Sequence, residues 1–208
     1  MVETTKPKRT RRSASARRDE IIITAKKRFA IAGFEGTTTR QIADDMGVAQ
    51  SLLLYHFKNK DELWKAVMRQ IFERAFEIGR EQIAQSEGID PKSQLVTGIR
   101  GFVRVCQEEP DLHRLMTLEG RSRTKRLEWL AENYLKSAHK KSVELIKQCQ
   151  KTGQVHTGDP TLLYYSIIGI AGTMFSFEPE IALLSLETTP PDPRAVEERI
   201  LAALFVGK

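Results

Sequence analysis

One glycine constrains the fold of this chain more than any other residue. Gly47 stands between two short segments whose apolar residues recur at helical spacing, Ile42 and Met46 before it and Val48 and Leu53 after it. A sharp reversal between helices commonly requires a positive φ, which glycine adopts without steric cost. Ala43 is small enough to let the second helix cross the first closely. Residues 37–60 therefore predict two short helices joined at a tight corner.

The second helix and the residues after it carry polar side chains suited to nucleic acid. They are Gln50, Ser51, Tyr55, His56, Lys58 and Lys60. Hydrogen-bond donors and cations of this kind reach base edges and phosphates. An ordinary helical hairpin inside a core is the alternative, but it does not account for so many polar groups on one short segment. We interpret the segment as a DNA-binding helix-turn-helix.

A longer run around this motif matches a known pattern. The run reads G-F-E-G-T-T-T-R-Q-I-A from Gly33 to Ala43, then G-V at 47–48, and L-L-Y-H-F-K-N-K-D-E-L from Leu53 to Leu63. It resembles the N-terminal signature of the tetracycline-repressor (TetR) family of bacterial transcriptional regulators, over about residues 19 to 65. The rest of the chain shows no comparable motif. The resemblance itself implies this, because the C-terminal part of that family diverges with the ligand.

Two positions depart from the family pattern. The family usually has Ser or Thr where Ala49 stands, so the usual side-chain cap of the second helix is missing or is supplied from elsewhere. Many relatives carry a tyrosine where Leu54 stands, and we expect Tyr55 to take over its phosphate contact.

The expected DNA contacts fall into two groups. Base readout is assigned to the exposed start of the second helix, at Gln50, Ser51 and Leu52, with Arg40 as a further candidate for a base edge. The phosphate contacts that fix the position of the head on DNA are assigned to Thr38, Thr39, Tyr55, His56 and Lys60. For His56, a place in the core is the competing interpretation.

Lys60 is distinguished by its position at the start of a helix. Asn59 and Glu62 form a capping-box pattern that predicts a long helix from Lys60 to about Ala84. A cation in the first turn opposes the helix dipole, and a bound phosphate would relieve the conflict. A solvated lysine is the alternative. The resemblance favours the phosphate, because the matching lysine of the family contacts the DNA backbone.

The first 18 residues form a strongly basic segment. The segment contains a single acidic residue, Glu3, and seven cations: Lys6, Lys8, Arg9, Arg11, Arg12, Arg17 and Arg18. Such a segment cannot bury apolar surface, so residues 1–18 are expected to be a disordered arm that tracks DNA. No apolar stretch follows that would make it an export signal, and the apolar run at 167–177 is too short to span a bilayer. A merely solubilising tail is the alternative.

The chain lacks the residue patterns of metal sites and of common enzymes. Two cysteines, Cys106 and Cys149, make no disulfide framework in 208 residues, so both are expected to be reduced in a cytoplasmic protein. The four histidines lack the paired ligands that a metal needs. No nucleophile elbow, Walker loop or dinucleotide fingerprint occurs. We therefore expect no enzyme activity, metal or cofactor.

Helical spacing of apolar residues recurs through nearly the whole chain, whereas strand-like alternation does not. The fold is predicted to be all-α, with a DNA-binding head at residues 19–65 and a larger body at residues 66–208. Helix starts are marked by Asp90-Pro91, Pro110, Asp159-Pro160 and Asp192-Pro193. Further helices are expected at about residues 18–32, 123–151 and 179–186, the last before a break at Pro190-Pro191.

The body is expected to bind a small molecule and to form a dimer. Its candidate ligand residues combine aromatic surface with hydrogen-bonding tips: Phe102, Cys106, His113, Met116, Trp129, Tyr134 and Tyr165. Simple core packing is the alternative for each. Small residues between positions 160 and 176 favour close helix packing, inside the body or across a subunit boundary, and the last helix is a second interface candidate. The resemblance implies that the last two long helices form a four-helix dimer bundle.

These features predict a cytoplasmic homodimer that regulates transcription as a repressor. Two heads about 34 Å apart would read a palindromic operator in double-stranded DNA. A small effector, not identified by the sequence, would release the operator through a coupling of about 1 to 3 kcal/mol. A DNA-bound adaptor controlled by a protein partner is one alternative, and it would have a solid core in place of a cavity. A helical enzyme is the other, disfavoured because no nucleophile and base occur at recognisable spacing.

Overall fold

The computed structural model describes residues 14–86, 89–184 and 192–206. Within these ranges the regular secondary structure is helical, apart from one isolated antiparallel bridge between Val155 and Phe205. The predicted all-α fold is confirmed. The elements are α1 (Ala14–Ala32), α2 (Thr39–Asp45), α3 (Gln50–His56), α4 (Lys60–Ala84), α5 (Pro91–Glu108), α6 (Pro110–Glu119), α7 (Lys125–Leu130), the π-helical turn η1 (Ala131–Leu135), α8 (Lys136–Lys151), α9 (Pro160–Ser176), α10 (Glu178–Leu184) and α11 (Pro193–Leu204).

The chain divides into two compact units, Met1–Val67 and Met68–Lys208, and the division falls inside α4. We use head and body for these two units. Helix α1 begins at Ala14, earlier than the expected start near Arg18, so residues 14–18 are helical rather than part of a disordered arm. The rest of the predicted arm, residues 1–13, lies outside the described residues.

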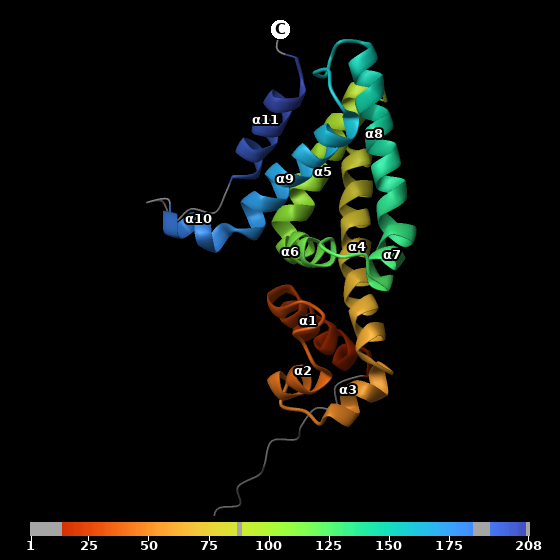
Figure 1. Ribbon diagram of the computed structural model, residues 1–208, viewed down its shortest axis with the longest axis vertical. Coiled ribbons are helices and arrows are strands. Elements are labelled where there is room, and N and C mark those ends of the chain that lie inside the picture. Colours follow the sequence, from red (N-terminus) through yellow and green to blue (C-terminus); the bar gives the residue numbers. More distant parts are fainter. Residues whose placement is uncertain (1–13, 87–88, 185–191, 207–208) are drawn as a thin grey trace, which may run out of the picture. The chain divides into compact units, whose positions relative to one another are not determined.

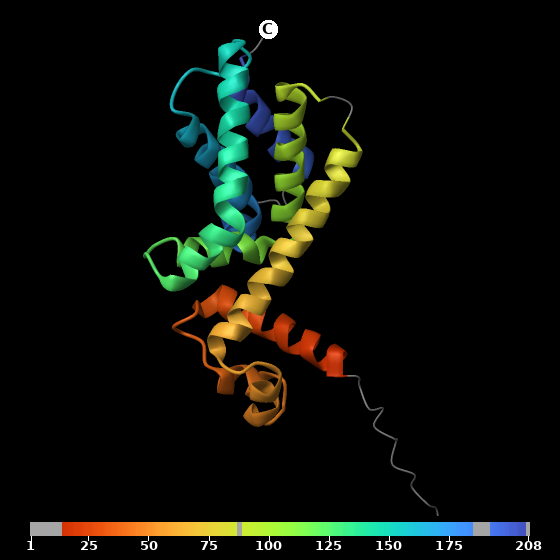
Figure 2. The same cartoon turned by 90° about the vertical axis from the view of Figure 1, so that its right-hand side faces the viewer.

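The head is built around one apolar face of α1. Ile22, Ala25 and Phe29 recur at helical spacing and are buried, and Gly33 ends the helix at a φ of 70°. Helix α2 packs against both α1 and α3 (Figure 2). The fully buried Trp64 of α4 closes the core, with its ring edge-on to Phe34 at 6.4 Å. The head is therefore a three-helix unit completed by the first turns of α4.

The turn between α1 and α2 leaves no room for a side chain at Gly36. A Cβ atom at this position would lie 2.3 Å from the backbone oxygen of Ala32. The neighbouring Thr37 is fully buried, and its hydroxyl donates a hydrogen bond to the carbonyl of Gly33 at 2.8 Å. This turn is therefore fixed by close backbone approach as well as by hydrogen bonding.

Four body helices, α5, α6, α9 and α11, begin where the sequence predicts. Asp90, Asp159 and Asp192 each cap a helix with the side chain accepting a backbone N–H, and proline follows in the first turn. Helix α5 packs against α8, α9 and α11, and α9 packs against α8 and α11 (Figure 1). One continuous apolar core joins α5, α8, α9 and α11 and contains no residue of α4. Long side chains, described below, link α4 to its neighbours.

Two predicted body helices differ in detail from the structure. The segment expected as one helix over 123–151 is interrupted by η1 and begins at Lys125, after the cap Thr124. Helix α10 begins at Glu178, and its expected end near 186 and the Pro190-Pro191 break lie outside the described residues. No single helix in the described ranges is long and apolar enough to cross a membrane, although α9 and α10, bent by 72° at their junction, meet the criteria as a pair.

Candidate nucleic-acid interface and effector site

The corner between α2 and α3 is built from its capping residues. Thr38 caps α2 by accepting the backbone N–H of Gln41 at 3.2 Å, and the Gln41 side chain accepts the Thr38 N–H at 2.9 Å. At the other end Gly47 adopts a φ of 62°, and the N–H of Val48 donates to the carbonyl of Ala43 at 3.0 Å. The predicted helix-turn-helix geometry is therefore present.

The first turn of α3 presents polar groups to solvent. Ala49 provides no side-chain cap, as its identity predicts, and Gln50 and Ser51 are exposed. The Gln50 amide donates to the hydroxyl of Thr39 at 2.8 Å, which joins the first turns of α2 and α3. Leu52 is half-buried. The structure thus brings together Gln50 and Thr39, one residue from each predicted group of DNA contacts.

The last turn of α3 carries a large exposed aromatic residue. Tyr55 is 82% exposed, and its ring lies edge-on to that of His56 at 5.4 Å. His56 is half-buried, between the two environments considered for it. Leu54 is also exposed, at 41%. An aromatic side chain held outside the core of a small helical head is suited to contact with another molecule.

An ion pair that the sequence did not indicate joins α1 to α2. The Arg28 guanidinium forms two hydrogen bonds with the Asp45 carboxylate, one of them from Nη2 to Oδ1 at 2.5 Å. These bonds hold the pKa of Asp45 below its usual value and raise that of Arg28. Arg40, on the neighbouring turn of α2, is exposed. Arg28 therefore fixes the helix-turn-helix to α1, and Arg40 stays accessible to a partner.

Lys60 directs its ammonium group into the head. Its Nζ donates to the carbonyl of Phe34 at 2.9 Å and to that of Thr37 at 3.0 Å. The same atom lies 4.0 Å above the centre of the Phe34 ring. The Asn59 side chain accepts the N–H of Glu62 at 2.8 Å, as the capping pattern predicts. The start of α4 is thus tied to the turn between α1 and α2.

The predicted ligand residues do not lie together in one cavity. Phe102 and Cys106 belong to the apolar core of the body, where burial raises the pKa of the Cys106 thiol to about 12. Met116 is half-buried on α6. Tyr165 is 59% exposed on α9. Trp129 and Tyr134 lie together elsewhere, in contact with aromatic residues of α4.

We call this group the aromatic cluster, which consists of Phe72, Phe76, Trp129 and Tyr134. The rings of Phe72 and Tyr134 stack in parallel with centroids 4.2 Å apart, and Trp129 meets Tyr134 edge-on at 5.5 Å. Residues five apart in an α-helix point about 140° away from each other. The π-helical turn η1, with its i→i+5 pattern, brings these two rings onto one side.

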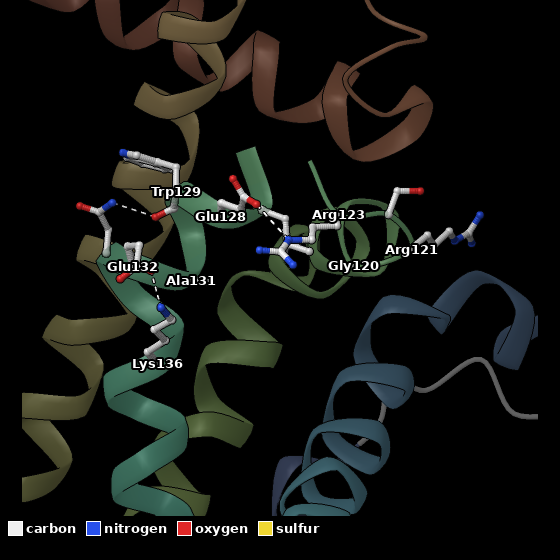
Figure 3. Close-up of a pocket in the computed structure, with 11 residues that line it drawn as sticks. Gly120, Arg121, Arg123, Glu128, Trp129, Ala131, Glu132 and Lys136 are labelled. Atoms are coloured by element: carbon white, nitrogen blue, oxygen red, sulfur yellow. Dashed lines mark hydrogen bonds and ion pairs between the residues drawn. The ribbon is translucent and has the colours of Figure 1, made fainter. Parts of the chain in front are cut away.

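An open hollow of about 840 Å³ lies beside Trp129 (Figure 3). Its wall is formed by residues 120–123 and by the turns from Leu127 to Lys136. Two ion pairs line it, Arg123 with Glu128 at 3.0 Å and Lys136 with Glu132. The Asn133 amide donates to the Trp129 carbonyl at 2.7 Å. The hollow is therefore lined by one aromatic residue and several polar groups.

His113 makes a tight contact between α6 and α9. Its Nδ1 lies 3.0 Å from the Ser176 hydroxyl, and burial lowers the pKa of its imidazole. A Cβ atom on Gly172 would come within 2.0 Å of the His113 ring. The Nε of the neighbouring Arg114 donates to the Ser176 carbonyl at 3.0 Å. His113 therefore holds α6 against the end of α9 and is not a member of the aromatic cluster.

The sequence did not predict two groups of ion-paired residues in the body. Arg74 and Arg104 bind the Glu108 carboxylate from α4 and α5, each with a contact of 2.6 Å, and Arg104 also binds Glu81. Burial alone would raise the pKa of Glu108, but these hydrogen bonds lower it. The second group is the buried pair of Glu119 and Arg126, 2.9 Å apart. Helical spacing could have indicated only the pair of Arg104 and Glu108, four positions apart on α5. The other contacts join residues of different helices, which spacing within one helix does not predict.

The described ranges contain no group of three or more histidine, cysteine or acidic residues arranged to hold a metal ion. Both cysteines are buried free thiols.

Comparisons with known proteins agree with this architecture. A model of the bacterial regulatory proteins of the tetR family matches residues 21–67. The transcriptional regulator RutR of Escherichia coli O157:H7 is 31% identical over 176 residues, which cover 82% of this chain and 79% of RutR. The ketosteroid regulator KstR2 of Mycobacterium tuberculosis superposes with a TM-score of 0.66 at 18% identity, covering 92% of this chain and 96% of KstR2. AibR, solved with isovaleryl coenzyme A and operator DNA, superposes with a TM-score of 0.67 at 18% identity, covering 91% of this chain and 98% of AibR.

A helix-turn-helix head followed by an all-helical body defines a class of DNA-binding transcriptional regulators. The identity to RutR extends through most of both chains and therefore includes the body as well as the head. The chain belongs to the TetR family of bacterial transcriptional regulators. The resemblance inferred from residues 33–63 is confirmed.

Proposed function

We propose that this regulator is a homodimeric repressor that binds a palindromic operator and is released by a small effector. The observation that carries the proposal is the exposed polar first turn of α3, where Gln50 and Ser51 face solvent beside the capped start of α2. Base readout belongs to Gln50, Ser51 and Leu52, with Arg40 in addition. Thr38, Thr39, Tyr55, His56 and Lys60 contact phosphates.

A second copy of the chain is the proposed partner of α9. Leu162, Tyr165, Ser166 and Gly169 recur along this helix at a spacing of three or four residues, and all are exposed. A Cβ atom on Gly169 would meet no other atom within 4 Å, so a neighbouring helix has room to approach closely. Tyr165 is then a dimer contact rather than an effector contact. Two-fold pairing presents two heads to successive major grooves about 34 Å apart.

Exchanging Gln50 for alanine is expected to change which sequences are bound. Sequences selected by the protein from a random pool of duplexes should lose preference at one or two positions, with about 1 to 3 kcal/mol less discrimination. Tyr55→Phe is the matched control, since it removes one hydroxyl from the same helix and should weaken binding to all sequences alike. A common loss of affinity for every sequence in the Gln50 variant would contradict base readout.

The proposed effector site is the hollow beside Trp129. The observation that supports it is the aromatic cluster, where α4 meets the turn η1 through side chains rather than through the main apolar core. An effector with an apolar portion would lie against Trp129, and its polar groups would reach Arg121 and Asn133. AibR was solved with an acyl coenzyme A thioester, which makes such thioesters the first candidates to test.

Titration with acyl coenzyme A thioesters and small carboxylic acids is expected to quench Trp129 fluorescence and to weaken operator binding by about 5- to 150-fold. The variant Trp64→Phe removes the buried tryptophan of the head, so that the remaining signal comes from Trp129. Saturable quenching with unchanged operator affinity would contradict the coupling. Control by a protein partner is the second candidate, favoured by the openness of the hollow, and a partner would then release the operator without any of these compounds.

A further inference from the structure

The side-chain amide of Gln50 is held by the hydroxyl of Thr39. Its Nε2 donates to the Thr39 Oγ1 at 2.8 Å, across the corner between α2 and α3. Thr39 is half-buried, whereas Gln50 is exposed. The residue before Thr39 is the cap of α2, so the backbone that carries the hydroxyl is fixed. One end of the Gln50 amide is therefore anchored to the helix-turn-helix, and the rest of it faces solvent.

The groups that remain on Gln50 suit one base. A glutamine amide has two N–H donors and one acceptor oxygen, and Thr39 takes one of the donors. One N–H and the oxygen are left, and neither has a partner among the described residues. In the major groove adenine presents an acceptor, N7, beside a donor, N6. Guanine presents two acceptors, cytosine a donor and thymine an acceptor, so the free groups of Gln50 complement adenine best.

The hydroxyl of Thr39 can serve Gln50 and a phosphate at the same time. A hydroxyl has one proton to donate and two lone pairs that accept. The bond from Gln50 uses a lone pair, and the proton has no acceptor among the described residues. That proton is available to a phosphate oxygen, the contact assigned to Thr39 above. A hydrogen bond to an ionised group is stronger than a neutral one and polarises the next bond along the chain.

We infer that Thr39 is a positioning residue for base readout, which orients the Gln50 amide so that it selects adenine. The inference rests on the proposed DNA-binding function and names the base that Gln50 reads. A phosphate contact by itself affects all sequences alike, because phosphates carry no sequence information. Loss of the orienting hydroxyl changes instead how strongly one base is preferred over the others.

The test measures base preference in the full-length chain. Selection from a random pool of duplexes identifies the position whose preference disappears in Gln50→Ala. Fluorescein-labelled duplexes with each of the four bases at that position are then compared by anisotropy. The wild type should bind adenine more tightly than the other bases by about 5- to 150-fold.

Two substitutions of Thr39 separate orientation from phosphate contact. Thr39→Val keeps the shape of the side chain and removes the hydroxyl, so it should reduce the preference for adenine by about 2- to 13-fold, the net contribution of one hydrogen bond. Thr39→Ser keeps the hydroxyl and should keep the wild-type preference. Circular dichroism checks that the variants fold, and Thr39→Ala carries the same measurement if Thr39→Val does not.

A third substitution tests the identity of the base. Gln50→Glu replaces the amide by a carboxylate, which only accepts hydrogen bonds. Cytosine presents a donor, N4, and should replace adenine as the preferred base in this variant.

Two results would overturn the inference. One is an unchanged preference in Thr39→Val with a common loss of affinity for all four bases, which would leave Thr39 as a phosphate contact only. The other is a wild-type preference for a base other than adenine at the position that depends on Gln50. A uniform loss of affinity in Gln50→Ala would be a different failure, since it would contradict the proposed base readout and the inference with it.

Discussion

Replacing Gly36 with alanine is expected to destabilise the head by about 2 to 3 kcal/mol, because the new methyl group forces backbone to move. The added Cβ would lie 2.3 Å from the carbonyl oxygen of Ala32, and a backbone atom cannot rotate away as a side chain does. Displacing this turn also disturbs Thr37, whose hydroxyl is hydrogen-bonded within it. Chemical denaturation followed by circular dichroism measures the loss, and duplex binding should fall with it.

Gly47→Ala is the matched control in the same head. A Cβ there would meet nothing within 4 Å, but the residue has a φ of 62°, which costs an L-amino acid about 1 to 2 kcal/mol. The two glycines therefore separate steric clash from backbone strain. Equal stability of Gly36→Ala and the wild type would mean that the turn between α1 and α2 is not as tight as described.

Replacing Glu119 with alanine is expected to cost the body about 3 kcal/mol, because breaking one side of a buried ion pair leaves the remaining charge poorly solvated. The Glu119 side chain is 7% exposed and that of Arg126 is 15% exposed. Glu119 also accepts the Thr124 hydroxyl at 3.0 Å, so it joins the end of α6 to the cap of α7. Thermal unfolding measures the loss.

Replacing both partners separates two contributions to the free energy of unfolding. One is the net contribution of the ion pair, and the other is the cost of leaving a single buried charge without its partner. The double variant Glu119→Leu with Arg126→Met removes both charges and should cost about 1 kcal/mol or less, since apolar side chains of similar volume replace a buried pair at little cost. Glu119→Gln keeps an acceptor for Thr124, so its stability should lie between that of Glu119→Ala and that of the double variant. A double variant that is less stable than Glu119→Ala would contradict this account.

Local signals in the sequence were enough to predict much of the fold. Gly47 marks the corner of the helix-turn-helix, and each Asp-Pro pair marks a helix start, because caps and positive φ are decided by residues adjacent in the chain. The ranges of α4 and α6 follow from similar signals at Asn59 and Pro110. The exposed face of α3 was also predictable, since the apolar spacing leaves the other side to solvent.

The arrangement of side chains in the body was not predictable in the same way. Helical spacing indicates which face of a helix is apolar, but it does not indicate which helix that face meets. Phe102 therefore packs against the core of the body, whereas Trp129 contacts Arg69 of α4. Lys60 is a similar case in the head, because its partners Phe34 and Thr37 lie more than twenty positions earlier.

The π-helical turn η1 has a consequence for how relatives of this protein differ. Deleting one residue from positions 131–133 would restore a regular α-helix, since a π-helical turn accommodates a single extra residue. Trp129 and Tyr134 would then stand four residues apart, and four residues turn an α-helix by about 400°, so both rings would stay on one side. A relative that is one residue shorter here can thus present the same pair of rings, which an inspection of position numbers alone would overlook.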